Sequence, residues 1–168
     1  MSVLVDRRGI LFLAASLATS LSTACLGAVH CRHRRVLFVC QFGTVKSPVA
    51  REFFRRRAAE RGFRVEAEAR GITPAGHRSD DLRRGLKLDH INVGADPLRK
   101  LAAADARRAD VLVFFDKLPP QIRAAITRDW TELPSMNSNY QAARSELLRR
   151  IDLLLDDPSV NTGKGDNC

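Results

Sequence analysis

The chain of 168 residues contains only four cysteines, and their positions exclude a disulfide framework. They are Cys25, Cys31, Cys40 and Cys168, so no cysteine lies between Cys40 and the last residue. No pair has the close spacing of zinc ligands, so we expect no metal site, and nothing in the sequence implies an organic cofactor. Cys40 stands alone in the part of the chain expected to fold, where it is either a nucleophile or an inert buried side chain.

Aromatic residues that could stack on bases are also scarce, with one Trp and one Tyr in the whole chain. The net charge of +9 would suit nucleic acid, but the arginines are spread along expected helices. The positive net charge would equally well attract a small anionic substrate. We therefore expect no nucleic-acid partner.

Residues 1–30 have the pattern of an export leader. Arg7 and Arg8 precede an apolar stretch at residues 9–21, small residues follow, and Cys25 allows lipidation. This pattern predicts a periplasmic or exported protein that contacts a membrane only through an uncleaved or lipidated leader. The alternative is a start codon placed too far upstream, which predicts a cytoplasmic protein. The folded domain is expected at residues 31–155, and the polar residues 156–168 are expected to form a disordered tail.

Two short apolar runs, at residues 36–39 and 111–115, are typical of strands buried on both faces of a parallel sheet. Residues 63–70 alternate strictly and indicate a half-exposed edge strand, and residues 130–134 supply a candidate fourth strand. Helices are expected between these strands, and the pattern therefore predicts an α/β fold with a mostly parallel sheet. Ligands of such folds bind at the carboxyl ends of the strands, where Cys40 and Asp116 would face one crevice.

The expected helices have recognisable start and stop signals. Ser47 is a suitable N-cap with Pro48 at the first helical position, and Gly62 is a suitable stop. Ser79 would cap a short second helix. Further helices are expected at residues 96–108, 119–127 and 147–155, the last with one apolar stripe.

Residues 35–48 carry the strongest chemical signal. The strand ends at Cys40, a cation follows at Lys46, and a Ser-Pro pair then opens a helix. A thiolate at a helix N-terminus, surrounded by backbone N–H groups, suits a tetrahedral oxyanion. This motif predicts phosphate chemistry with a thiol nucleophile.

The motif resembles the phosphate-binding loop of the low-molecular-weight protein tyrosine phosphatase and arsenate reductase superfamily. Residues 69–71, the Gly-His-Arg turn at residues 76–78, the strand at residues 109–116 and the segment 130–151 are also similar, so the resemblance covers about residues 35–155. It implies a three-layer αβα domain with a four-stranded parallel sheet in the order 2-1-3-4.

The resemblance also implies roles for individual residues. Cys40 would be the nucleophile that forms a phosphocysteine, and Ser47 would donate a hydrogen bond to its thiolate. His77 would brace the loop, although a simple turn histidine is the equal alternative. The backbone N–H groups that would cradle the phosphate belong to Gln41, Phe42, Gly43, Thr44, Val45 and Lys46.

Three loop positions depart from the family pattern. Lys46 stands in place of the family's arginine, and lysine offers a point charge instead of a rigid two-pronged fork. Gly43 replaces the asparagine that locks the loop but can still adopt a left-handed conformation. Val45 replaces a second cysteine, so the protective disulfide of the family cannot form.

The sequence departs from the family pattern a fourth time at the position of the proton donor. Family phosphatases carry an Asp-Pro pair before the last helix, and here the position of that acid falls on Ser135. Asp116, Asp129 and Glu132 are the remaining candidates. A general acid contributes roughly 100- to 10,000-fold to the rate, so its identity matters.

Three functions remain open at this point. The first is a cysteine-dependent phosphatase acting on a phosphorylated protein or a small phosphomonoester, with slow turnover or unusual specificity. The second is an arsenate reductase that uses an external thiol as reductant. The third is a non-catalytic module that binds phosphate or a phosphoprotein. Thr44 resembles the threonine at this loop position in members directed at phosphoarginine.

Overall fold

The computed structural model describes residues 33–94 and 97–161. The expected leader at residues 1–30 lies outside the described residues, as do Cys25, Cys31 and Cys168. Four strands form one sheet in the order β2-β1-β3-β4, and every pairing is parallel. They are β1 (Arg34–Cys40), β2 (Val65–Gly71), β3 (Val111–Phe114) and β4 (Thr127–Asp129). The strand order expected from the family resemblance is confirmed.

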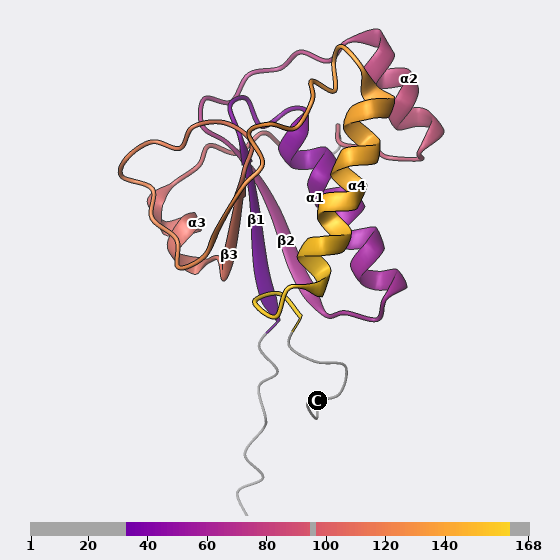
Figure 1. Cartoon of the computed structure of the whole chain (residues 1–168). Helices are drawn as coiled ribbons and strands as arrows, with labels where there is room; N and C mark the ends of the chain where they lie inside the picture. Colours follow the sequence, from indigo (N-terminus) through magenta and orange to yellow (C-terminus); the bar gives the residue numbers. More distant parts are fainter. Residues whose placement is uncertain (1–32, 95–96, 162–168) are drawn as a thin grey trace, which may run out of the picture.

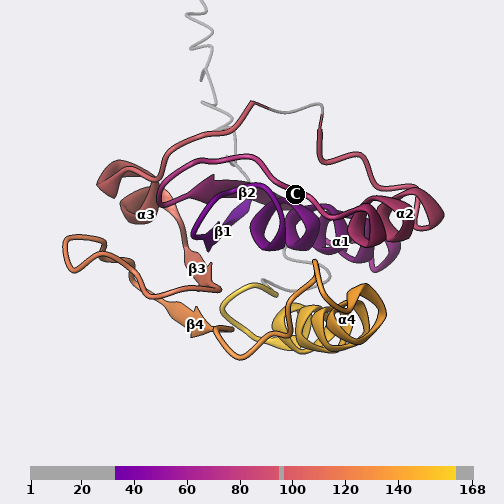
Figure 2. The ribbon, with the colours of Figure 1, turned by 90° about the horizontal axis from the view of Figure 1, so that it is seen from above.

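Helices cover both faces of this sheet, which gives the expected three layers. They are α1 (Lys46–Glu60), α2 (Asp80–Leu88), α3 (Ala103–Arg108) and α4 (Tyr140–Asp156). Figure 1 shows α1, α2 and α4 on one side of the sheet and α3 on the other, and Figure 2 shows the same layers from above. No helix among the described residues has the length and apolar character needed to span a membrane.

Strand β1 separates two hydrophobic clusters because its side chains alternate between the faces of the sheet. Val36, Phe38 and Cys40 belong to the larger cluster, which is packed with residues of α1 and α4. Leu37 and Val39 belong to the smaller cluster beneath α3. The alternation therefore places the Cys40 side chain on the same side of the sheet as α1.

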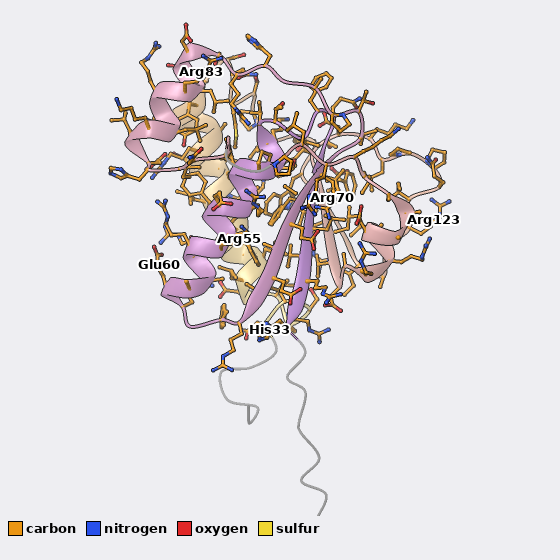
Figure 3. All side chains as sticks on the ribbon, turned by 180° about the vertical axis from the view of Figure 1, so that it is seen from behind. His33, Arg55, Glu60, Arg70, Arg83 and Arg123 are labelled. Carbon is orange, nitrogen blue, oxygen red and sulfur yellow. The ribbon has the colours of Figure 1, made fainter. Side chains whose placement is uncertain are left out.

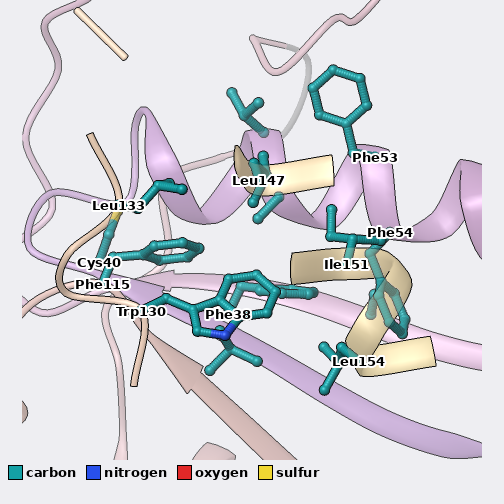
Figure 4. Close-up of a cluster of buried hydrophobic side chains, with 14 of the residues drawn as sticks. Phe38, Cys40, Phe53, Phe54, Phe115, Trp130, Leu133, Leu147, Ile151 and Leu154 are labelled. Atoms are coloured by element: carbon teal, nitrogen blue, oxygen red, sulfur yellow. The ribbon is translucent and has the colours of Figure 1, made fainter. Parts of the chain in front are cut away.

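Aromatic rings fill the larger cluster directly behind Cys40 (Figure 4). The ring centroids of Phe38 and Phe54 are 5.5 Å apart in an edge-on arrangement, and Trp130 lies 5.7 Å from Phe115 in the same geometry. Because these are preferred aromatic geometries, the rings form a well-packed layer behind the carboxyl end of β1.

The charged side chains of Arg55 and Arg56 are exposed on α1, as the helical periodicity predicted. Figure 3 shows Arg55 and Glu60 on α1 and Arg83 on α2. Arg51 is an exception: its residue is 8% exposed, although the helical pattern placed it on the outer face.

Two of the helices predicted between β2 and β4 differ from the structure. The helix expected from residue 96 begins only at Ala103, because extended backbone at residues 99–101 pairs with Gly71. The helix expected at residues 119–127 is absent, and this segment instead runs as a loop that buries Ile122 against the smaller cluster. The fourth strand is Thr127–Asp129, slightly before the expected residues 130–134.

The ends of two helices also differ from the expectation. Helix α1 begins one residue before Ser47, with Val45 in the capping position and no side-chain cap. Residues 156–161, expected in a disordered tail, are part of the folded domain: α4 runs to Asp156, and Val160 is 1% exposed. The side chain of Arg128 also holds Asp157, through Nε at 3.2 Å. The stop at Gly62, with a φ of 74°, is as predicted.

Candidate active site

A cavity of about 400 Å³ opens at the carboxyl ends of β1 and β3. Its walls come from the loop after β1, the turn at residues 75–77, Asp116 after β3, and the loop before α4. The lining residues are Cys40, Gln41, Phe42, Thr44, Val45, Lys46, Ala75, Gly76, His77, Asp116, Ser135, Met136 and Asn137. The crevice expected from the parallel-sheet topology therefore brings Cys40 and Asp116 together.

Cys40 presents a buried sulfur that accepts hydrogen bonds from its own loop. The residue is 4% exposed, and the backbone N–H of Gly43 donates to Sγ at 3.2 Å. Ser47 Oγ lies 3.1 Å from Sγ and 3.2 Å from the carbonyl oxygen of Arg70. The serine has one hydroxyl proton, so it donates to the sulfur when Cys40 is a thiolate and to Arg70 when Cys40 is a thiol.

The loop between Cys40 and α1 turns its carbonyl groups outward. The carbonyl oxygens of Cys40, Gln41, Phe42 and Thr44 accept hydrogen bonds from Ile72 N, Thr73 N, Ala75 N and Arg78 Nε, at 2.8 to 3.2 Å. The N–H groups of Phe42, Thr44 and Val45 have no acceptor within the described part of the chain. Free N–H groups followed directly by a helix N-terminus form an anion-binding nest.

One N–H of this nest is already engaged by a carboxylate. Gln41 N donates to Asp116 Oδ2 at 2.7 Å, and this contact ties the start of the loop to the end of β3. Of the described carboxylates, Asp116 alone lines the cavity. It therefore faces the same space as the Cys40 sulfur.

The other two acid candidates lie elsewhere. Glu132 and Asp129 line a second cavity, together with Trp130, Thr131 and Arg150. The side chain and backbone N–H of Thr131 hydrogen bond to Asp129 and lower the pKa of that carboxyl. The structure therefore does not bring Glu132 to Cys40, contrary to the expectation that it belongs to the site.

Lys46 reaches across the cavity. Its Nζ donates to the carbonyl oxygen of Leu133 at 3.1 Å, which links the nest to the loop before α4. Ser79 anchors that loop further along, through hydrogen bonds with the side chain and carbonyl of Asn137 at 3.0 and 2.9 Å. A lysine ammonium has three donors, so Lys46 keeps two for an anion.

His77 lies on the cavity wall and makes no hydrogen bond with the described residues. The brace expected of it comes from the next residue, because Arg78 donates to the carbonyls of Thr44 at 2.9 Å and Val93 at 3.2 Å. The Gly-His-Arg turn marked this position in the sequence, but the pattern did not show which of the two side chains holds the loop.

Cys40, the one cysteine among the described residues, thus lies at the end of an inner parallel strand beside free N–H groups, an arrangement suited to an oxyanion. Within residues 33–94 and 97–161, no three His, Cys, Asp or Glu side chains cluster as metal ligands would. The groups that face the cavity are the Cys40 sulfur, the nest, Lys46 and Asp116.

The family follows from this combination of fold and site. The family model described as low molecular weight phosphotyrosine protein phosphatase matches residues 35–157, and the chain belongs to that family. A search of curated proteins finds no significant match.

Solved structures share the fold at low sequence identity. A low molecular weight protein tyrosine phosphatase from T. tengcongensis is 22% identical, covers 73% of this chain and 98% of its own, and gives a TM-score of 0.56. The YwlE arginine phosphatase from Geobacillus stearothermophilus is 21% identical, with coverages of 73% and 91% and a TM-score of 0.58. An arsenate reductase in the phosphate binding state is 17% identical, with coverages of 73% and 97% and a TM-score of 0.60.

Proposed function

We propose that this protein is a cysteine-dependent phosphatase that hydrolyses phosphomonoesters through a phosphocysteine intermediate. The observation that carries the proposal is the buried Cys40 sulfur, held by Gly43 N–H and Ser47 beneath the free N–H groups of the nest. These donors favour the thiolate and bind the phosphoryl oxygens. The substrate is a phosphorylated protein or a small phosphomonoester.

The proposed reaction has two steps. The Cys40 thiolate attacks phosphorus, the ester bond breaks, and the leaving oxygen takes a proton from Asp116. A water molecule then attacks the phosphocysteine, loses a proton to Asp116, and releases inorganic phosphate and the thiolate. Gln41 N–H engages Oδ2 of Asp116, which leaves Oδ1 to carry the proton.

Lys46 supports this chemistry less effectively than an arginine would. Its Nζ is shared with the Leu133 carbonyl, and a single ammonium cannot hold two phosphoryl oxygens in a fixed geometry. We therefore expect slow turnover compared with an enzyme that has the family's arginine.

The experiment compares two aryl phosphates under reducing conditions. p-Nitrophenyl phosphate has a leaving group that barely needs protonation, whereas phenyl phosphate needs a general acid. Cys40→Ala should abolish hydrolysis of both compounds. Asp116→Asn should slow phenyl phosphate about 100-fold and p-nitrophenyl phosphate much less, as expected for a lost general acid.

Glu132→Gln is the matched control, since it removes a carboxylate from the second cavity instead. It should leave the hydrolysis of both compounds unchanged. A folded protein that binds phosphate but hydrolyses neither compound would contradict the proposal.

A further inference from the structure

Four carbonyl oxygens of the loop after β1 are held from outside the loop. Those of residues 40–42 accept hydrogen bonds from backbone N–H groups in the segment 72–75. The carbonyl oxygen of Thr44 instead accepts from a side chain, Nε of Arg78, at 2.9 Å. Of these four peptide groups, that of Thr44 alone owes its orientation to a side chain, which a mutation can remove.

A held carbonyl also fixes the N–H group of the same peptide, because the two point in opposite directions across a planar trans bond. The carbonyl oxygen of Phe42 accepts from Ala75 N at 3.2 Å. The N–H of the same peptide belongs to Gly43 and donates to Cys40 Sγ at 3.2 Å. No peptide bond among the described residues is cis. The outward carbonyl therefore sets the direction of the inward N–H.

The same rule applies to the peptide between Thr44 and Val45. Arg78 holds its carbonyl oxygen from behind, since Thr44 and Val45 line the cavity and Arg78 does not. The N–H of Val45 therefore turns away from Arg78, toward the cavity, and it has no acceptor within the described part of the chain. It is a donor left free for an anion.

Arg78 is well suited to hold this peptide still. Its Nη2 donates to the carbonyl oxygen of Val93 at 3.2 Å, and Val93 is buried. The planar guanidinium thus joins two main-chain segments with one rigid fork. Val45 stands in the capping position of α1, where no side chain makes a capping hydrogen bond, so the contact from Arg78 is the one that orients this peptide.

We propose that Arg78 is a positioning residue that aims the Val45 N–H at a phosphoryl oxygen bound beside Cys40. Without the guanidinium, the peptide between Thr44 and Val45 is free to rotate, and the nest loses one of its donors to phosphate. The inference deepens the proposed function. It rests on that function only for its effect on turnover, because the binding of phosphate needs no catalysis.

NMR of the full chain with inorganic phosphate tests the inference. In wild type, phosphate should shift the amide protons of Phe42, Thr44 and Val45 downfield as hydrogen bonds to a charged acceptor form. In Arg78→Met the shift of Val45 should be lost while that of Phe42 remains. The dissociation constant of phosphate should rise about tenfold, the loss expected for one hydrogen bond to a charged group. If the Val45 amide of wild type does not respond to phosphate, or responds equally in Arg78→Met, the inference is wrong.

Two further variants separate the fork from the charge. Arg78→Lys keeps the charge but cannot span both carbonyls in one plane, so it should bind phosphate almost as weakly as Arg78→Met. Burial lowers the pKa of Arg78, and the neighbouring charge of Arg83 lowers it further. Arg83→Met removes that charge outside the cavity, and it should change neither the Val45 shift nor the binding of phosphate. Full binding in Arg78→Lys would show that charge alone is enough and would overturn the inference.

Alkylation of Cys40 by iodoacetamide shows whether the rest of the loop stays folded. The sulfur contacts Gly43 N–H and Ser47 Oγ, and neither contact involves Arg78. The alkylation rate of Arg78→Met should therefore stay close to that of wild type although phosphate binds more weakly. A rate that falls in step with phosphate binding would mean that Arg78 only stabilises the loop as a whole, which contradicts the proposed role.

Turnover distinguishes the inference from the proposed function. In Arg78→Met, kcat for p-nitrophenyl phosphate should fall about 100-fold, as expected when one preorganised donor to the phosphoryl group is lost. Wild-type kcat in a variant that has lost the Val45 shift would contradict the role of Arg78. A wild-type protein that shows the Val45 shift but hydrolyses nothing would overturn the proposed function and leave the role of Arg78 in phosphate binding standing.

Discussion

Gly43 and Gly71 lie back to back, and neither has room for a side chain. A Cβ atom at Gly43 would be 2.9 Å from Gly71 N, and one at Gly71 would be 2.8 Å from Gly43 N. Gly43 also has a φ of 69°, a conformation that other residues adopt only with strain. This contact joins the nest around Cys40 to the end of β2, so the shape of the nest depends on both glycines.

Gly71→Ala should therefore damage the site and the fold together. The added methyl group would push against the backbone of the loop, which cannot move without losing its hydrogen bonds to residues 72–75. We expect a loss of about 2 kcal/mol in the free energy of unfolding, together with weaker phosphate binding. Urea denaturation and calorimetry measure the two effects. Gly94→Ala, which meets only an ordinary contact with Asn92, should change neither, and an unaffected Gly71→Ala would contradict the tight contact.

Ser47→Ala should make Cys40 less reactive. The Ser47 hydroxyl lies 3.1 Å from the sulfur in a fully buried position, so its removal takes away a donor that stabilises the thiolate. The rate of alkylation by iodoacetamide at neutral pH should fall about tenfold, in line with the loss of one hydrogen bond to a charged group. Ser135→Ala removes a cavity hydroxyl that does not contact the sulfur, and it should leave the rate unchanged. Equal rates in Ser47→Ala and wild type would show that Ser47 does not stabilise the thiolate.

Lys46→Arg should speed the reaction. A guanidinium can hold two phosphoryl oxygens in one plane, which a single ammonium cannot do. We expect kcat for p-nitrophenyl phosphate to rise about tenfold, whereas Lys46→Met should lower kcat/KM about 100-fold through the loss of a well-placed donor. Lys117→Met, at an exposed lysine that does not line the cavity, is the control for charge alone. A Lys46→Met variant with wild-type kinetics would exclude a role for this cation.

The contact of Asp157 with Arg128 predicts a pH dependence of stability. Hydrogen bonds from Arg128 and Ser159 lower the pKa of Asp157 from 3.8 to about 2. Its stabilising contribution is therefore fully present above about pH 4 and is lost as the pH falls through about 2. The two side chains are 36% and 24% exposed, so the contribution should not exceed about 1 kcal/mol.

Denaturation of wild type and Asp157→Asn across this pH range measures the contribution. The variant should be less stable at pH 7, and the difference should shrink between pH 4 and pH 2. If the difference in stability between wild type and Asp157→Asn stays constant over that range, Asp157 is not held by Arg128. The packing of residues 157–161 on the domain would then not depend on this contact.

The parallel sheet was predictable because its strands carry strong local patterns. The apolar run of β1 ends at Cys40 and the alternating run of β2 marks an edge strand, whereas the order of the four strands came from the family resemblance. The prediction of a helix at residues 119–127 was wrong because it used only the local pattern and the Pro-Pro pair as a helix start. These signals cannot show that Ile122 packs into the smaller cluster. Extended backbone at residues 99–101 is likewise set by pairing with Gly71, a contact distant in sequence.

The site was predictable where the chemistry resides in one short segment. Cys40, Ser47 and the loop N–H groups follow each other within eight residues, and the structure brings them together as expected. The position of Asp116 at the end of β3 predicted that it faces the crevice of Cys40, whereas only the fold shows that Asp129 and Glu132 line a different cavity.

The central claim is that Cys40 becomes covalently phosphorylated during turnover. Mass spectrometry of the protein, quenched in acid immediately after mixing with p-nitrophenyl phosphate, tests this directly. Cys40→Ala is the comparison, because a serine at this position would keep a nucleophilic hydroxyl. We predict a single added phosphoryl group on the Cys40 peptide of the wild type and none in Cys40→Ala. Release of p-nitrophenol without any phosphorylated Cys40, or at the same rate in Cys40→Ala, would contradict the account.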